Sequence, residues 1–81
     1  MDLTTHLKTF VTVASFNGFS GAARQLGVVP SVVAKRIAQL EAHVGARLFN
    51  RTTRTIALTE AGEKLLAGAG VLMTGFDHLL D

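Results

Sequence analysis

Apolar residues recur at helical spacing along the first part of the chain, and short interruptions divide them into separate stretches. Leu3, Leu7 and Phe10 are spaced by four and three residues, which places them on one face of a helix. Asn17 and Gly18 predict the end of that helix, because both residue types tolerate the left-handed backbone conformation found at helix C-termini. The pattern therefore predicts a first helix that ends just before Asn17.

Two further helical stretches are separated by a very short turn. Ser20 is expected to cap a second helix that ends at Gly27. Pro30 is expected to begin a third helix, since proline is favoured at the first helical position, and Gly45 to end it. Two helices joined by a short turn that contains Gly are typical of a helix-turn-helix. The apolar stripe of the third helix consists of Val33, Ile37, Leu40 and Val44.

After the third helix the helical period gives way to two short runs that favour strands. Residues 47–51 and 55–59 flank Thr52, Thr53 and Arg54, and the second run is rich in β-branched residues. This arrangement predicts a small β-hairpin with its tip at the two threonines and Arg54. Placed after a helix-turn-helix, such a hairpin is the wing of a winged helix.

A last helix is predicted from Thr59 toward the end of the chain. Thr59 is expected to cap it, and Glu60 and Glu63 lie in its first turns, where the helix dipole favours negative charge. The chain thus divides into a winged helix-turn-helix domain over residues 1–59 and a linker or dimerisation helix over residues 60–81. The apolar stripe of this helix alternates steps of four and three, as in helices that pair, so we expect a homodimer. The dimerisation positions are Leu65, Ala69, Leu72, Phe76 and Leu79.

Composition narrows the class of protein further. The chain has 81 residues, 48% of them hydrophobic and 17% charged, which suits one small globular domain. It contains no cysteine, so disulfides, thiolate zinc sites and cysteine nucleophiles are excluded. The longest uncharged stretch, Thr9 to Ala23, is shorter than the ~20 residues of a membrane-spanning helix, and the N-terminus lacks the basic start of a signal peptide. We therefore expect a cytoplasmic protein without a membrane partner.

The charges are unevenly distributed along the chain. The formal net charge is +2, but residues 24–54 hold six Lys and Arg against Glu41 alone. The other acidic residues lie toward the two ends of the chain. Such a basic segment is expected of a surface that meets a polyanion, and an ordinary solvated basic face is the alternative. The charge pattern alone leaves both interpretations open.

Enzymatic and metal chemistry find no support in the sequence. His6, His43 and His78 lie on three different predicted helices without the spacing of metal ligands, so we expect no metal site. The three serines have no His nearby in the sequence, as a nucleophile and its base would require, and no Gly-rich phosphate loop follows a strand. We expect no catalytic residues and no cofactor, and the protein is predicted not to be an enzyme.

Nucleic-acid binding is the class of function that remains, and the third helix is the best candidate for the element that contacts DNA. With Val33 as zero and 100° per residue, Ser31 and Lys35 fall at about 160° and about 200°, opposite the buried stripe. This outer face also carries small alanines, so it is able to approach the floor of a DNA major groove. Val32 and Ala34 flank the face and are expected to contact thymine methyl groups.

Other polar and basic residues are candidates for the DNA backbone and the minor groove. Arg54 at the hairpin tip, next to Thr53, is expected to enter a narrow minor groove, where the potential is most negative. Arg36 is expected to meet a phosphate, and Arg51 either to meet a phosphate or to cap the third helix. Ser20 is able to donate to a phosphate from the start of the second helix. The alternative that these side chains are merely solvated stays open.

The chain also carries a series of short motifs at fixed spacing. They are Leu7-x-x-Phe10, Gly18-Phe19-Ser20-x-Ala22-Ala23-x-x-Leu26, Pro30-Ser31-x-Val33-x-Lys35-x-Ile37-x-x-Leu40-Glu41, Gly45-x-Arg47-Leu48-Phe49-x-Arg51-Thr52-Thr53-Arg54 and Leu58-Thr59-x-Ala61-Gly62. In this order and spacing they resemble the N-terminal DNA-binding domain of LysR-type transcriptional regulators. The resemblance extends from Leu7 to about Leu80, and the combination of motifs is more specific than any one of them.

The resemblance implies a fold, a function and a set of contact positions. The fold is mainly α, a winged helix-turn-helix of three helices and a β-hairpin followed by a long linker helix that dimerises. The third helix would read the major groove of double-stranded DNA, and the wing the minor groove. The family's effector-binding domain would be absent from this chain, which we expect to be a fragment. The positions that match the family's DNA contacts are Pro30, Ser31, Val32, Ala34, Lys35 and Arg54.

Three positions depart from the family pattern. Val29 stands where the family usually has a capping Ser or Thr, Ala34 where it often has Ser, and Gly21 where a polar or basic residue is common. The missing cap costs roughly 1 kcal/mol, because a valine side chain accepts no hydrogen bond. The sequence predicts sequence-specific DNA binding as part of a transcription regulator. The alternative is a dimeric helical protein-interaction module that does not read DNA.

Overall fold

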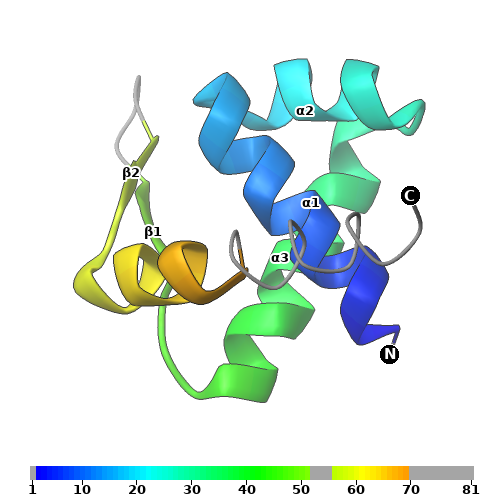
Figure 1. The fold of residues 1–81 in the computed structure, drawn as a ribbon. Helices are drawn as coiled ribbons and strands as arrows, with labels where there is room; N and C mark the ends of the chain where they lie inside the picture. Colours follow the sequence, from blue (N-terminus) through cyan, green and yellow to red (C-terminus); the bar gives the residue numbers. More distant parts are fainter. Residues whose placement is uncertain (1, 52–55, 70–81) are drawn as a thin grey trace, which may run out of the picture.

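The computed structural model describes residues 2–51 and 56–69 of the chain. Three helices are followed by a two-stranded antiparallel sheet, and residues 60–69 form a further helix. In Figure 1 the strands stand to the left of the helical body, with helix 60–69 in yellow and orange beside them. The elements are α1 (Leu3–Phe16), α2 (Phe19–Leu26), α3 (Pro30–Val44), β1 (Phe49–Arg51) and β2 (Ile56–Leu58). This order confirms the predicted mainly α, winged helix-turn-helix fold.

The helix ends follow from local backbone conformation, as predicted. Asn17 closes α1 in the left-handed region at φ 53°. Gly27 and Gly45 close α2 and α3 at φ 70° and 74°, where a residue without a Cβ is not strained. The sequence pattern did not predict the N-cap of α1, which is Asp2. The hydroxyl and the N–H of Thr5 both donate to the Asp2 carboxylate and hold its pKa below the usual range.

The predicted cap of α2 is wrong. The helix begins at Phe19, one residue before Ser20, and its N-cap is Gly18, without a side-chain hydrogen bond. Gly18 is extended, with φ 170° and ψ 164°, and its carbonyl accepts the N–H of Ala22. Because the cap position is Gly18, Ser20 lies two residues too late to cap the helix and is exposed in its first turn. Its contact with a DNA phosphate stays a prediction.

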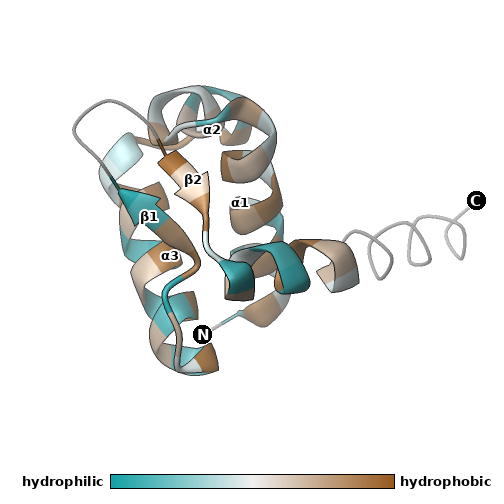
Figure 2. Ribbon diagram, turned by 90° about the vertical axis from the view of Figure 1, so that its left-hand side faces the viewer, coloured by the Kyte–Doolittle hydropathy of each residue, from teal (hydrophilic) through white to brown (hydrophobic). Residues whose placement is uncertain are grey.

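The core lies where the three helices meet the base of the hairpin. Phe10 of α1 packs against Phe49 of β1, with ring centroids 5.3 Å apart and planes inclined by 49°. Tilted aromatic pairs of this kind attract beyond the area that they bury. Figure 2 shows the two strands side by side, with β2 in hydrophobic colours and β1 hydrophilic toward its end. The buried hydrophobic residues of this core are Phe10, Val13, Ala22, Ala23, Val33, Ile37, Leu40, Leu48 and Phe49.

The hairpin is confirmed but its first strand is shorter than predicted. β1 and β2 pair in an antiparallel register over three residues each. Arg47 and Leu48, which the sequence placed in the first strand, lie in the loop before β1. The N–H of Leu48 donates to the side chain of Glu41 rather than to a neighbouring strand. The predicted tip with Thr53 and Arg54 lies outside the described residues.

Helix 60–69 is fastened to the base of the hairpin at its first turn. Thr59 caps it as predicted, since its Oγ1 accepts the N–H of Gly62 at 2.9 Å. The same hydroxyl donates to the carbonyl of Arg47 at 2.6 Å. A Cβ at position 62 would overlap the carbonyl oxygen of Leu48, so the close approach of helix and loop requires glycine there.

Candidate nucleic-acid interface

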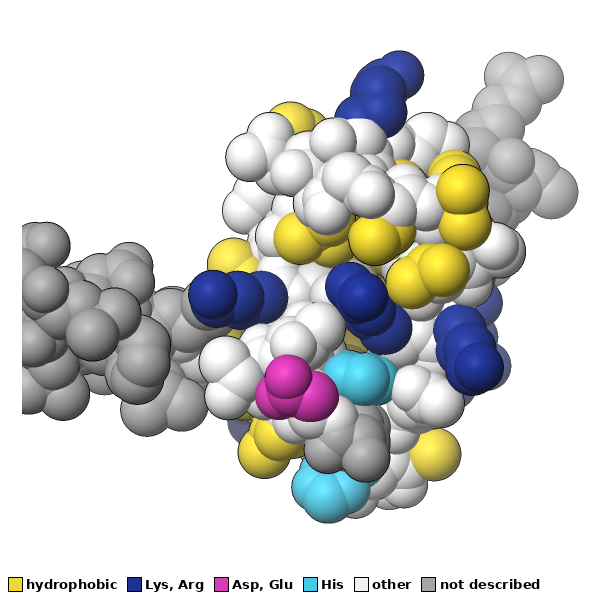
Figure 3. All heavy atoms as spheres, turned by 90° about the vertical axis from the view of Figure 1, so that its right-hand side faces the viewer, with side chains coloured by type: hydrophobic (Ala, Val, Ile, Leu, Met, Phe, Trp, Pro, Cys, Tyr) yellow, Lys and Arg dark blue, Asp and Glu magenta, His cyan; other side chains and the backbone are white. Residues whose placement is uncertain are grey.

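The outer face of α3 is exposed while its inner face is buried. Val33, Ile37 and Leu40 are fully covered by the rest of the domain, and Val32 and Ala34 are half-exposed on the flanks. We call the exposed side the reading face. Figure 3 shows one side of the molecule, where Lys and Arg side chains lie among hydrophobic ones. The exposed residues of the reading face are Ser31, Lys35, Ala38, Gln39 and Ala42.

The turn before α3 holds the start of the helix through backbone hydrogen bonds. Val29 is the N-cap in an extended conformation, and it makes no side-chain cap, as predicted. Its carbonyl accepts the N–H of Val32 at 3.0 Å and that of Val33 at 3.5 Å. Pro30 occupies the first turn and is exposed, and 59% of the Val29 surface is exposed as well. The start of α3, which is predicted to face DNA, therefore exposes the apolar side chains of Val29 and Pro30 ahead of Ser31.

Arg36 is tied to α1 on the other flank of α3. Its Nη1 donates to the hydroxyl of Thr9 at 3.3 Å, and the buried Thr9 hydroxyl in turn donates to the carbonyl of Thr5. A second link joins the same helices, since His6 Nε2 lies 2.7 Å from Oε1 of Gln39. The side chain predicted to reach a phosphate thus starts from a fixed position beside α1, and the phosphate contact stays a prediction.

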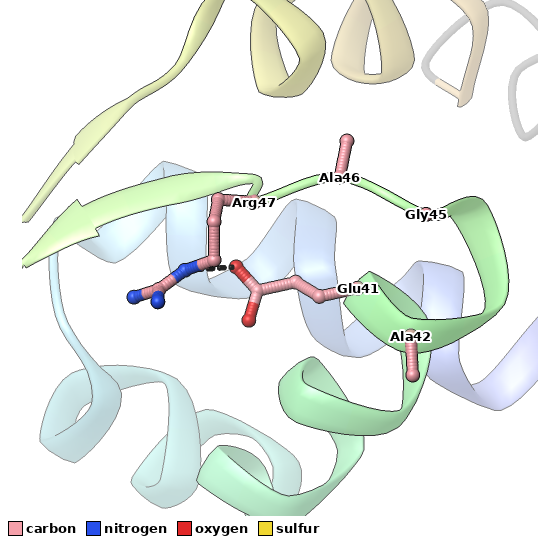
Figure 4. Close-up of a pocket in the computed structure, with 5 residues that line it drawn as sticks. All are labelled: Glu41, Ala42, Gly45, Ala46 and Arg47. Atoms are coloured by element: carbon pink, nitrogen blue, oxygen red, sulfur yellow. Dashed lines mark ion pairs between the residues drawn. The ribbon is translucent and has the colours of Figure 1, made fainter.

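Glu41 connects the last turns of α3 with the hairpin. Its side chain is only 10% exposed, and its Oε2 accepts the backbone N–H of Leu48 at 2.8 Å. Arg47 Nε lies 3.6 Å from the same oxygen, and Arg51 Nη2 lies 3.7 Å from Oε1. Figure 4 shows the carboxylate of Glu41 and the guanidinium of Arg47 facing each other at a depression of about 450 Å³. The depression is lined by Glu41, Ala42, Gly45, Ala46 and Arg47.

Arg51 is directed toward the helices of its own domain. Besides Glu41 it contacts Phe19 of α2, with the guanidinium carbon 5.0 Å from the ring centroid. A cation over an aromatic face is attracted by the ring quadrupole. Sequence reasoning missed both partners, although Glu41 stands out as the single acidic residue of the basic segment. The Arg51 side chain keeps 37% of its surface exposed, and its contact with a phosphate stays a prediction.

Only the first two predicted dimerisation positions are described. Leu65 is half-buried and packs against the domain core together with Leu66. Ala69 is already buried within the single chain. The first turns of this helix therefore contribute to the domain core, and pairing with a second chain stays a prediction. The remaining positions, outside the described residues, are Leu72, Phe76 and Leu79.

Two kinds of site are not found in the part of the chain that the structure describes. Over residues 2–51 and 56–69, no helix has both the length and the apolar character needed to cross a membrane. Over the same ranges, no three His, Asp or Glu side chains come together in a way that could hold a metal ion.

The fold and the site together define a class of protein. A helix-turn-helix whose second helix exposes a small, polar and basic face, with a hairpin fastened beside it, is a winged helix-turn-helix domain. Over residues 4–63 the sequence matches a family model described as bacterial regulatory helix-turn-helix protein, lysR family. The chain belongs to that family.

Relatives and solved structures share this architecture. An HTH-type transcriptional repressor of Pseudomonas aeruginosa is 40% identical over 79 residues, which are 98% of this chain and 25% of that protein. The crystal structure of the BenM DNA-binding domain with catB site 1 DNA has a TM-score of 0.92 at 28% identity, covering 99% of this chain and 89% of that one. The CbnR DNA-binding domain with DNA has a TM-score of 0.88 at 31% identity, covering 96% and 88%. The chain spans about a quarter of the length of the first curated relatives that it matches.

Proposed function

We propose that this chain is the DNA-binding domain of a LysR-type transcription regulator and binds double-stranded DNA sequence-specifically. The observation that carries the proposal is the exposed reading face of α3 opposite a fully buried stripe. Membership of the lysR family, and the likeness to two domains solved with DNA, favour it over a protein-interaction module that does not read DNA. No enzymatic activity is proposed. A bacterial regulator of this kind would act in the cytoplasm, where its DNA lies.

The proposed contacts to bases come from α3 in the major groove. Lys35 is able to donate to guanine O6 and N7, and Ser31 to a neighbouring base edge. Val32 and Ala34 would lie against thymine methyl groups, since both offer apolar surface on the flanks of the reading face. Pro30 at the helix start would pack against the groove wall.

The proposed contacts to the backbone and the minor groove come from the rest of the domain. Arg36, Arg51 and Ser20 are the candidates for phosphate contacts. Thr53 and Arg54 at the hairpin tip are proposed to meet the adjacent minor groove, where a narrow groove attracts arginine.

We also propose that residues 60–81 form a homodimer helix. The support is the apolar stripe that continues beyond the described part of the chain at alternating steps of four and three. Two copies would then place two reading faces on two half-sites of one operator, as dimeric helix-turn-helix proteins do.

Selection of bound duplexes from a random pool, followed by comparison of variants, tests the function. Lys35→Ala should change the preferred base at one or two positions and weaken binding to the selected site by about tenfold, the loss expected for one specific contact. Lys64→Ala removes the same charge from an exposed residue that pairs with Glu60, and should leave the preferred sequence unchanged. If the parent selects no sequence, or if Lys35→Ala selects the same one with equal affinity, the proposal is wrong.

A further inference from the structure

The backbone and the side chain of Glu41 both organise the connection between α3 and β1. The Glu41 carbonyl accepts the N–H of Gly45 at 2.9 Å and the N–H of Ala46 at 3.2 Å, which closes the helix. The carboxylate then accepts the N–H of Leu48, two residues further along the loop. Three backbone donors of the loop, the N–H groups of residues 45, 46 and 48, thus converge on one residue of the helix.

The loop that Glu41 holds is also the base of the hairpin. Leu48 and Phe49 are each 1% exposed, so the start of β1 is anchored in the core. The carbonyl of Leu48 accepts the N–H of Thr59 at 3.0 Å, which fastens the same residue to the chain just after β2. The base of the hairpin is therefore attached to α3 through the N–H of Leu48 and to helix 60–69 through its carbonyl.

Glu41 reaches the far end of β1 as well. Its Oε1 lies 3.7 Å from Nη2 of Arg51, the last residue of the strand, and the Arg51 guanidinium lies over Phe19 of α2. The carboxylate contacts therefore join both ends of β1 to the helix-turn-helix. Because the side chain is largely buried, water competes with these contacts less than at an exposed ion pair.

We propose that Glu41 is the positioning residue of the wing, which fixes β1 against α3 so that the hairpin and the reading face meet DNA in one fixed geometry. The proposal rests on the proposed function. On a helical projection Glu41 falls at about 80° from Val33, between the buried stripe and the reading face at about 160–200°. The Glu41 carboxylate therefore supports the hairpin without forming part of the surface that reads bases in the major groove.

The test compares two kinds of sequence discrimination in the full chain. Binding is measured to the selected duplex, to one with a base pair changed under the reading face, and to one with an A·T flank changed to G·C where the wing would lie. In the parent each change should weaken binding by about fivefold or more, the lower end of the cost of one wrong base pair. In Glu41→Gln the flank change should cost less than about twofold, while the change under the reading face keeps its full cost.

Glu60→Gln is the matched control. It makes the same chemical change and the same change of net charge at an exposed residue whose only described ion pair is with Lys64. It should discriminate both changed duplexes as the parent does. A role for Glu41 in stability alone would lower the affinity of Glu41→Gln for all three duplexes by one common factor, and that result overturns the proposal.

Arg51→Lys provides a second variant if Glu41→Gln folds poorly. Lysine keeps the charge that a phosphate contact needs but lacks the planar group that lies on Phe19 and faces Glu41. Arg51→Lys should lose flank discrimination as Glu41→Gln does. The double variant should lose no more discrimination than the worse single variant, because the two substitutions break the same contact between Arg51 and Glu41. Full flank discrimination in Arg51→Lys would overturn the proposal. A parent that binds no duplex would instead overturn the proposed function.

Discussion

At the residue scale, two glycines of helix 60–69 differ in their surroundings. A Cβ at Gly62 would overlap the carbonyl oxygen of Leu48 and lie 3.0 Å from Cδ2 of Leu58. A Cβ at Gly68 would meet nothing within 4 Å. Helical propensity treats the two positions alike, so only the tertiary approach of the loop separates them.

Gly62→Ala should therefore destabilise the domain although alanine is the better helix former. The overlap with a backbone oxygen is expected to cost about 1–3 kcal/mol, more than the gain in propensity. Gly68→Ala is the control and should raise the free energy of unfolding by up to about 1 kcal/mol. Urea unfolding followed by circular dichroism measures both. A Gly62→Ala variant as stable as Gly68→Ala would show that the loop and the helix do not approach this closely.

Residues whose role is local could be predicted from the sequence, and residues whose partners are distant could not. Asn17, Gly27 and Gly45 end helices through their own backbone conformation, which residue type indicates. Glu41 depends on Arg51, ten positions later, and on the fold that brings β1 beside α3. The charge count marked Glu41 as exceptional without indicating what it contacts.

At the scale of elements, α3 lacks the side-chain cap that most helices use. Val29 has the extended conformation of an N-cap, with φ −78° and ψ 152°, but no polar side-chain atom. More than half of its surface is exposed, so the valine contributes little to the core. The helix that carries the reading face therefore starts with a deficit that one substitution should repair.

Val29→Ser should stabilise the domain by about 0.5–2 kcal/mol, because the serine hydroxyl is able to accept an N–H of the first turn. The midpoint of urea unfolding should rise with an unchanged slope. Val44→Ser, at the other exposed end of α3, is the control and should give no such gain, since no free N–H lies there. Equal effects of the two serines would contradict the assignment of Val29 as the N-cap.

The order of elements was predictable because each element shows its own spacing of apolar residues or has turn-forming residues at its ends. The sequence predicted the hairpin from two short β-favouring runs, but it placed Arg47 and Leu48 in the first strand. Their backbone groups are taken by Glu41 and Thr59, contacts that arise only when α3 and helix 60–69 are in place. Strand length thus depends on tertiary partners that strand propensity does not report.

At the scale of the whole molecule, helix 60–69 uses part of its apolar surface within its own domain. Leu65 and Leu66 pack against the domain, which leaves Leu72, Phe76 and Leu79 as the proposed contacts to a second copy. Leu72→Glu should abolish the dimer in sedimentation, because it places a charge in the apolar stripe. Ala67→Glu, at an exposed position of helix 60–69, should leave the dimer intact. A dimer that persists in Leu72→Glu would place the interface elsewhere.

The uneven charge of the chain leads to the most direct test of its central function. A salt titration of binding to a selected duplex measures how many phosphates the domain neutralises, since each contributes about 0.9 to the slope of log affinity against log salt. For four or more phosphates, affinity should fall by about a hundredfold or more between about 50 and 200 mM salt. Binding that does not depend on salt, or no binding to any duplex at low salt, would contradict DNA recognition by this domain.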